Sequence, residues 1–298
     1  MIKEILIAGY QGSNSVHTKS IKHFIDNISN EYNVNYIMDI TINNEKASSL
    51  IDKTINQNID ISYLLSSYYE SIIPEIKILD LPYFFNSRNE AYDLLKSDFF
   101  YLIDNKLSNF NLKLLGFWDN GIRHFSSQKM IEKPRDCIGQ ILRTTPSPLH
   151  IKIFKSFGFT TNPLDVRDFK IAIKENTINA QENPLTNYWN FEVYNYQKFI
   201  TLSSHMFGFC LFVINKDYFE TLNLKQKEKM LDCSVKTTKF QRNLALKEDA
   251  MLIKKIKDQG IKIVTPETKN LNKFKKKSQA FHKKYFKDYP HMKKYIQL

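Results

Sequence analysis

The chain has 298 residues, of which 42% are hydrophobic and 13% aromatic, and it carries a formal net charge of +12. This length allows two domains or one large one, and the hydrophobic content is ample for packed cores, which excludes a disordered chain. No apolar run approaches the roughly 18 residues that a membrane helix needs, and GxGxxG and Walker motifs are absent, which argues against a nucleotide-binding site.

The chain has three cysteines, Cys137, Cys210 and Cys233. Their number is odd, and no two of them have CxxC spacing. We therefore expect buried free thiols in place of a disulfide framework. The histidines are scattered and contain no HExxH motif, so we predict neither a metal nor a cofactor.

The N-terminal segment alternates short apolar strands with helical patterns. We predict strands at residues 3–8, 34–38 and 59–64, with one helix at 16–28 and a second that runs to about residue 56. Ser13, Asn14 and Ser15 precede the first helix, and all three are favourable N-cap types. This alternation indicates an α/β domain with a largely parallel sheet.

Prolines interrupt the pattern in the next segment. Between Pro74 and Pro82 we predict an apolar strand, followed by helices at 90–95 and 99–110. We then expect strands at 112–117 and 122–125 on either side of a turn at 119–121. A second α/β alternation follows, with a strand at 140–144, helices at 149–157 and 166–175, and strands at 178–181 and 206–215.

The longest helical pattern covers residues 224–259. Asn223 and Gln226 have the spacing of a capping box, and Gly260 fits the position just beyond the end of the helix. At about 1.5 Å per residue the helix would span roughly 50 Å, which exceeds the width of one small domain. We therefore predict that it crosses between two α/β lobes that have a cleft between them.

Lysines and aromatic residues are interleaved at residues 273–294. Phe274, Phe281, Tyr285 and Tyr289 recur there at helical spacing. The pattern is typical of an amphipathic helix that packs on a domain, and we favour this interpretation. The alternative is stacking of the rings on nucleic-acid bases, although no nucleic-acid-binding motif accompanies them.

Two arginines, Arg123 and Arg143, lie in or beside short apolar segments and apart from the lysine clusters. Arg143 follows Ile141 and Leu142 at the end of a predicted strand. A guanidinium is always charged, and its planar fork suits bidentate pairing with a carboxylate. A buried arginine without an acid near it in sequence needs an anion from elsewhere, either a protein carboxylate on a neighbouring element or a bound ligand.

The stretch from residue 121 to residue 205 holds a set of short motifs. They are GIR at 121–123, PRD at 134–136 with Gly139, ILR at 141–143 and QENP at 181–184. LDLPYFF at 79–85 and TLSSH at 201–205 add to them. From about residue 5 to residue 260, their order and spacing resemble the DctP-type solute-binding proteins of TRAP (tripartite ATP-independent periplasmic) transporters.

The resemblance implies an α/β, two-lobe periplasmic-binding-protein fold with a hinge and one long helix that spans both lobes. The first lobe would contain about residues 1–120 and 209–248, and the second about residues 121–208 and 249–298. Members of the family capture small carboxylates in the periplasm and pass them to a membrane permease. An export signal would then have been removed from this sequence, and we expect a monomer that binds no nucleic acid.

The resemblance also assigns roles to particular residues. Arg143 would be the principal carboxylate clamp, with Arg123 as its cationic neighbour. Asn183 would donate an amide hydrogen bond to the same group. Gln11, in the turn after the first strand, would reach the ligand from the opposite lobe.

Three further residues receive weaker assignments. His205 would lie at the edge of the cleft. Trp189 is the aromatic residue that we expect to shape the pocket, although core packing is the default for such a ring. Glu182 is expected to be a structural hydrogen-bond acceptor or salt-bridge partner.

The chain departs from the family pattern at two places. Asn179 and Ala180 replace the usual Asp-Gly pair before the QENP motif. Leu65 stands where sialic-acid-binding members carry an acidic residue, so we do not expect sialic acid as the ligand.

These observations predict an extracytoplasmic solute-binding protein for a small mono- or dicarboxylate, acting without catalysis. No paired-carboxylate or nucleophile–base arrangement can be assembled from residue spacing alone. The alternatives are a two-lobe α/β enzyme that acts on a small carboxylate and a basic protein that binds nucleic acid through its C-terminal segment.

Overall fold

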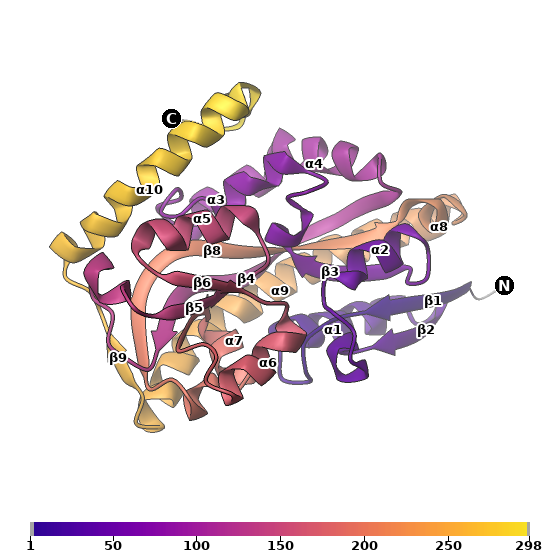
Figure 1. Ribbon diagram of the computed structural model, residues 1–298. Coiled ribbons are helices and arrows are strands. Elements are labelled where there is room, and N and C mark those ends of the chain that lie inside the picture. The colour runs from indigo at the N-terminus through magenta and orange to yellow at the C-terminus, as the bar shows by residue number, and fades with distance from the viewer. Residues whose placement is uncertain (1–2, 297–298) are drawn as a thin grey trace.

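The computed structural model describes residues 3–296, in which nine strands form one mixed sheet with helices packed around it (Figure 1). The strand order is β2-β1-β3-β8-β4-β7-β5-β6, with β9 paired to β8. The strands are β1 (Lys3–Ala8), β2 (Tyr32–Ile37), β3 (Ile61–Leu65), β4 (Leu112–Ser127), β5 (Ile141–Thr144), β6 (Thr160–Pro163), β7 (Ala180–Pro184), β8 (Phe199–Asn215) and β9 (Lys262–Val264). The α-helices are α1 (Val16–Ile28), α2 (Ser49–Ile55), α3 (Arg88–Lys96), α4 (Asp98–Ser108), α5 (Pro148–Phe157), α6 (Val166–Lys174), α7 (Leu185–Asn190), α8 (Lys216–Glu220), α9 (Leu224–Asp258) and α10 (Thr268–Asp288).

Two long strands, β4 and β8, join the two halves of the sheet. They contain 16 and 17 residues and pair antiparallel along most of their length. Strands β1 and β2 lie at one end of this pair, and β5 and β6 lie at the other (Figure 1). Pairing within each end is parallel, between β1 and its neighbours β2 and β3 and between β5 and its neighbours β6 and β7. The chain therefore forms two α/β lobes that share two continuous strands.

Strand β4 does not contain the turn that we predicted at residues 119–121. The pairing register with β8 shifts between Asp119 and Gly121, and Gly121 has φ +103°, a backbone conformation that favours glycine. The extra residue is taken up as a bulge, so the chain continues as one strand where the sequence suggested two.

The strand predicted between Pro74 and Pro82 is also wrong. This segment forms a 3₁₀ helix, Pro74–Asp80, in which Ile76, Ile78 and Leu79 are buried. A short apolar run does not distinguish a strand from a buried helical turn, and a proline at the first position suits a helical start.

Helix α9 confirms the long spanning helix. Asn223 and Gln226 form the expected capping box, and Gly260 lies just beyond the helix with φ +72°. The helix packs against α1 of the first lobe and α7 of the second. It therefore links the lobes along one side, while β4 and β8 link them through the sheet.

The C-terminal basic segment forms the amphipathic helix α10, as predicted. The Phe274 ring is buried against Phe125 and Phe157 of the second lobe, at centroid distances of 5.8 and 5.2 Å. Further along, the Tyr285 hydroxyl donates to the Glu75 carbonyl in the first lobe at 2.7 Å. The lobe boundaries, 1–120 with 209–248 and 121–208 with 249–298, remain a prediction, and α10 contacts both lobes.

Cys137, Cys210 and Cys233 are buried free thiols, as predicted. Among the helices of residues 3–296, none has both the length and the apolarity that crossing a membrane requires.

Candidate ligand-binding site

Arg143 lies on β5, the short strand of the second lobe whose pairing with β6 and β7 buries it. Its side chain is 1% exposed, and its guanidinium lies 5.0 Å above the centre of the Phe169 ring. Nε and Nη2 donate to the Leu164 carbonyl at 3.0 and 2.6 Å. Within residues 3–296, Arg143 forms no ion pair with a carboxylate. Burial lowers the pKa of Arg143, and the arginine remains a cation that a neutral carbonyl only partly satisfies.

Arg123, on β4, has a different environment because β7 places Glu182 beside it. Nε and Nη2 of Arg123 donate to the two carboxylate oxygens of Glu182 at 2.5 and 2.7 Å, and Nη2 also donates to the Glu182 carbonyl at 2.9 Å. The third nitrogen, Nη1, is buried and has no partner within residues 3–296. Glu182 is thus a salt-bridge partner, as the sequence suggested.

In this pair, the charge of each group favours the ionised form of the other. Burial by itself would raise the pKa of Glu182, but the Arg123 charge and the hydrogen bonds from His205 and Arg123 hold that pKa well below its usual range. Burial would likewise lower the pKa of Arg123, and the Glu182 charge raises it overall. Both groups are therefore ionised inside the second lobe.

Asn183 follows Glu182 on β7 and belongs to a chain of buried amides. Its Nδ2 donates to Gln181 Oε1 at 2.5 Å, and its Oδ1 accepts from Asn187 Nδ2 at 3.2 Å. Nη2 of Arg123 also lies 3.5 Å from this oxygen. These bonds fix the orientation of the Asn183 amide next to Arg123.

His205, on β8, lies beside the Glu182 carboxylate. His205 is 0% exposed, its Nε2 lies 3.4 Å from Glu182 Oε2, and its Nδ1 lies 2.8 Å from the Ser203 hydroxyl. The ring stacks on Phe125 with centroids 4.5 Å apart. Burial, the first cause, lowers the pKa of His205. His205 therefore contacts the Glu182 carboxylate and helps to fix its position.

Trp189, on α7, is partly buried. Its ring stacks on Tyr194 at 4.8 Å, and Lys255 Nζ of α9 lies 4.1 Å from the ring centre. These contacts tie α7 to the long helix.

Gln11 follows β1 in the first lobe and is 1% exposed. Its Oε1 accepts from the Ser15 hydroxyl at 2.5 Å, whereas its Nε2 is buried without a partner within residues 3–296. Ser15 also caps α1, so one serine fixes both the helix start and the amide of Gln11. A buried amide nitrogen without an acceptor is unusual and calls for a ligand or a water.

Sequence reasoning missed Tyr68, which follows β3 in the first lobe. Its hydroxyl is buried and has no partner within the described residues. Burial raises the pKa of Tyr68, the Asp165 charge raises it further, and the Arg143 charge opposes both. The phenol thus lies close enough to Arg143 for their charges to interact, although the two residues belong to different lobes. The run of serines and tyrosines at 66–69 offered no spacing that would have identified it.

Several hydrogen bonds hold the two lobes against each other around this cluster. The Asp165 carboxylate, at the start of α6, accepts from the backbone nitrogens of Ala47 and Ser48 at 2.9 and 3.1 Å. Ser147 Oγ donates to Glu70 Oε2 at 3.0 Å. The lobes are therefore closed, which explains why the arginines are buried.

The sequence matches the DctP family, described as bacterial extracellular solute-binding protein, family 7, over residues 7–288. The chain therefore belongs to this family.

Relatives with named ligands are about a quarter identical to the chain over the aligned residues. The chain is 27% identical over 228 residues to the 2,3-diketo-L-gulonate-binding periplasmic protein YiaO of Escherichia coli, and the match covers 76% of this chain and 69% of YiaO. It is 27% identical over 186 residues to the C4-dicarboxylate-binding protein DctB of Bacillus subtilis, covering 61% of this chain and 53% of DctB.

Solved structures of the family superpose closely on the chain. The sugar acid binding protein DctPAm from Advenella mimigardefordensis, in complex with galactonate, gives a TM-score of 0.90 at 23% identity and covers 100% of this chain and 95% of that one. A TRAP periplasmic solute binding protein from Haemophilus influenzae with bound L-gulonate gives 0.91 at 20% identity, with 99% and 98% covered. This likeness confirms the two-lobe periplasmic-binding-protein fold.

Proposed function

We propose that this protein captures a small sugar acid or other carboxylate between its two lobes and delivers it to a TRAP membrane permease, without catalysis. The observation that carries the proposal is the isolation of Arg143. It is a buried cation with no carboxylate partner within residues 3–296, and in this family the neighbouring structures hold galactonate, L-gulonate or succinate. A ligand carboxylate supplies the anion that the protein itself does not provide.

The roles of the remaining residues follow from which of their hydrogen-bonding atoms have no partner in the protein. Arg123 is held by Glu182, so only its Nη1 is available to the ligand, and Asn183 lies beside it with a fixed amide. From the first lobe, Gln11 offers its unpartnered Nε2, and Tyr68 offers a buried hydroxyl close to Asp165. His205 acts through Glu182, and Trp189 acts by fixing α7 against α9.

Contacts from both lobes explain closure. A ligand stabilises the closed form only by the difference between its affinities for the two forms, and groups from both lobes reach it together only when the lobes close. Each charge-assisted hydrogen bond contributes roughly 1.5–3 kcal/mol, so a few of them supply much of the about 8 kcal/mol of a micromolar affinity. We do not expect sialic acid as the ligand, because Leu65 replaces the acidic residue of the sialic-acid-binding members.

Thermal unfolding with a panel of sugar acids and dicarboxylates tests the proposal. We expect at least one acid to raise the melting temperature of the unmodified protein in a concentration-dependent way. The same acid should stabilise Arg135→Ala, which removes an exposed arginine, and should fail to stabilise Arg143→Ala. Equal stabilisation of both variants would refute the role of Arg143, and a panel without any hit would refute carboxylate binding.

A further inference from the structure

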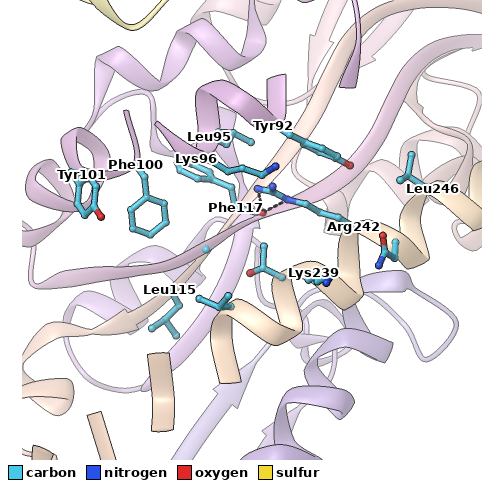
Figure 2. Close-up of a pocket in the computed structure, with 14 residues that line it drawn as sticks. Tyr92, Leu95, Lys96, Phe100, Tyr101, Leu115, Phe117, Lys239, Arg242 and Leu246 are labelled. Carbon is cyan, nitrogen blue, oxygen red and sulfur yellow. Dashed lines mark hydrogen bonds between the residues drawn. The ribbon is translucent and has the colours of Figure 1, made fainter. Parts of the chain in front are cut away.

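A pocket lies on the first lobe, between α9 on one side and α3, α4 and β4 on the other (Figure 2). Its volume is about 580 Å³, within the range of roughly 300–1,000 Å³ that small-molecule sites occupy. No residue of the Arg143 cluster lines it. The pocket therefore lies outside the function proposed above and needs an explanation of its own.

The walls of this pocket are apolar. Leu95, Phe100 and Leu115 come from α3, α4 and β4, and α9 contributes Val235 and Leu246. Val235 and Leu246 are 68% and 43% exposed, which is unusual for two branched side chains on the same helix face. An apolar ligand surface placed against Val235, Phe100 and Leu115 would be removed from water on several sides.

The pocket also has a cationic part. Lys96, Lys239 and Arg242 line it, and none of its lining residues is acidic. The side chains of Lys96 and Arg242 point toward each other across the pocket (Figure 2). Like charges that converge in this way favour an anion between them.

Arg242 is held in place by neutral groups. Its guanidinium stacks 4.5 Å from the centre of the Tyr92 ring, and Nε and Nη2 donate to the Phe117 carbonyl at 3.2 and 2.9 Å. It forms no ion pair within residues 3–296. Asp119, whose charge acts on Arg242, is already bonded to Arg88 and to the Tyr92 hydroxyl. The arginine is thus oriented but not neutralised.

We propose that this pocket binds an amphipathic carboxylate, such as a medium-chain fatty acid. The carboxylate lies beside Lys96 and Arg242, and the acyl chain extends from there along Val235, Phe100 and Leu115. The combination of an apolar body with an anionic head distinguishes this ligand from the hydrophilic acids assigned to the site between the lobes.

Calorimetric titration with octanoate tests the inference, and the experiment uses the full chain carrying Arg143→Ala so that the other carboxylate site is disabled. We expect octanoate to bind, and butyrate and octylamine to bind at least tenfold more weakly, because the first lacks the apolar chain and the second has the opposite charge. Failure of octanoate to bind, or equal binding of octylamine, would overturn the proposal.

Two substitutions on α9 then locate the binding. Leu246→Glu places a negative charge in the pocket wall and should weaken octanoate binding at least tenfold. Met251→Glu is the matched control, because Met251 is 62% exposed on the same helix but does not line the pocket. Octanoate affinities that are the same in both variants would show that the acid binds elsewhere and would refute the site.

Discussion

The guanidinium of Arg123 and the carboxylate of Glu182 face each other across β4 and β7, with N–O distances of 2.5 and 2.7 Å and with both side chains no more than 1% exposed. The two arginines that stand out in the sequence therefore have different roles. Arg123 is neutralised by the protein, whereas Arg143 donates only to a backbone carbonyl. The pair places a fixed, fully ionised group beside the free cation, and this difference leads to the predictions below.

Glu182→Gln should destabilise the protein strongly at neutral pH. It keeps the side-chain shape but leaves the buried Arg123 charge unpaired, and breaking a buried ion pair in this way costs about 3–5 kcal/mol. Urea unfolding at pH 7 measures the loss. Glu228→Gln, at an exposed position on α9, is the control and should change the unfolding free energy by less than about 0.5 kcal/mol.

The same pair predicts a dependence on acid. The pKa of Glu182 is lowered in the folded state, so its stabilising contribution is present above the unfolded pKa of about 4.3 and is lost as the pH falls toward the folded pKa. The unmodified protein should therefore lose more stability below pH 4 than Glu182→Gln does. Parallel pH profiles for the two proteins would contradict this assignment.

Because of His17, the folded protein should lose stability as the pH falls from 6.5 to 4. It is 0% exposed, its Nε2 bonds Asn120 Oδ1 at 2.9 Å, and its ring stacks between Tyr63 and Trp118. Burial lowers the pKa of His17 from 6.5 to about 4. The unfolded chain therefore binds a proton that the folded chain does not, and stability falls with decreasing pH by up to about 3 kcal/mol across this window.

Urea unfolding at several pH values between 6.5 and 4 measures this contribution. His17→Gln should show a shallower loss of stability than the unmodified protein over that window, because glutamine can bond Asn120 without titrating. A slope in His17→Gln as steep as in the unmodified protein would assign the effect to other groups.

The sequence predicted much of the fold and part of the site, and the limits have physical causes. Periodicity located β1, α1 and α9 because each buries one regular face. The apolar run after Pro74 predicts a strand where a 3₁₀ helix forms, because burial on all sides removes the periodic signal of a helix. Strand β7, which carries Glu182, lies between β4 and β5, so whether Arg123 or Arg143 meets that carboxylate depends on how each strand is aligned with β7, and no local pattern contains that information.

Gly121→Ala should be more destabilising than the same change at Gly139. Both glycines have positive φ, +103° and +80°, where alanine is strained by roughly 1–2 kcal/mol. A Cβ at Gly121 would also lie 2.7 Å from Pro184 Cβ, whereas nothing lies within 4 Å at Gly139. The proline ring cannot rotate away, so we expect Gly121→Ala to cost about 1–3 kcal/mol more in unfolding free energy. Equal costs would show that the β4 bulge relaxes freely.

Arg143→Lys should bind the ligand poorly although it keeps the positive charge. Arg143 already uses Nε and Nη2 on the Leu164 carbonyl, and its planar fork leaves further N–H groups directed elsewhere. A lysine ammonium is a single point that cannot reproduce both sets of bonds, so at least one charge-assisted hydrogen bond is lost, worth roughly 1.5–3 kcal/mol or about 10- to 100-fold in affinity. Calorimetric titration with the acid that stabilises the unmodified protein measures the change. The affinity of Arg143→Lys for the acid should lie between those of Arg143→Ala and the unmodified protein, because the charge and the geometry of the side chain contribute separately. An affinity for Arg143→Lys equal to that of the unmodified protein would show that charge alone holds the ligand.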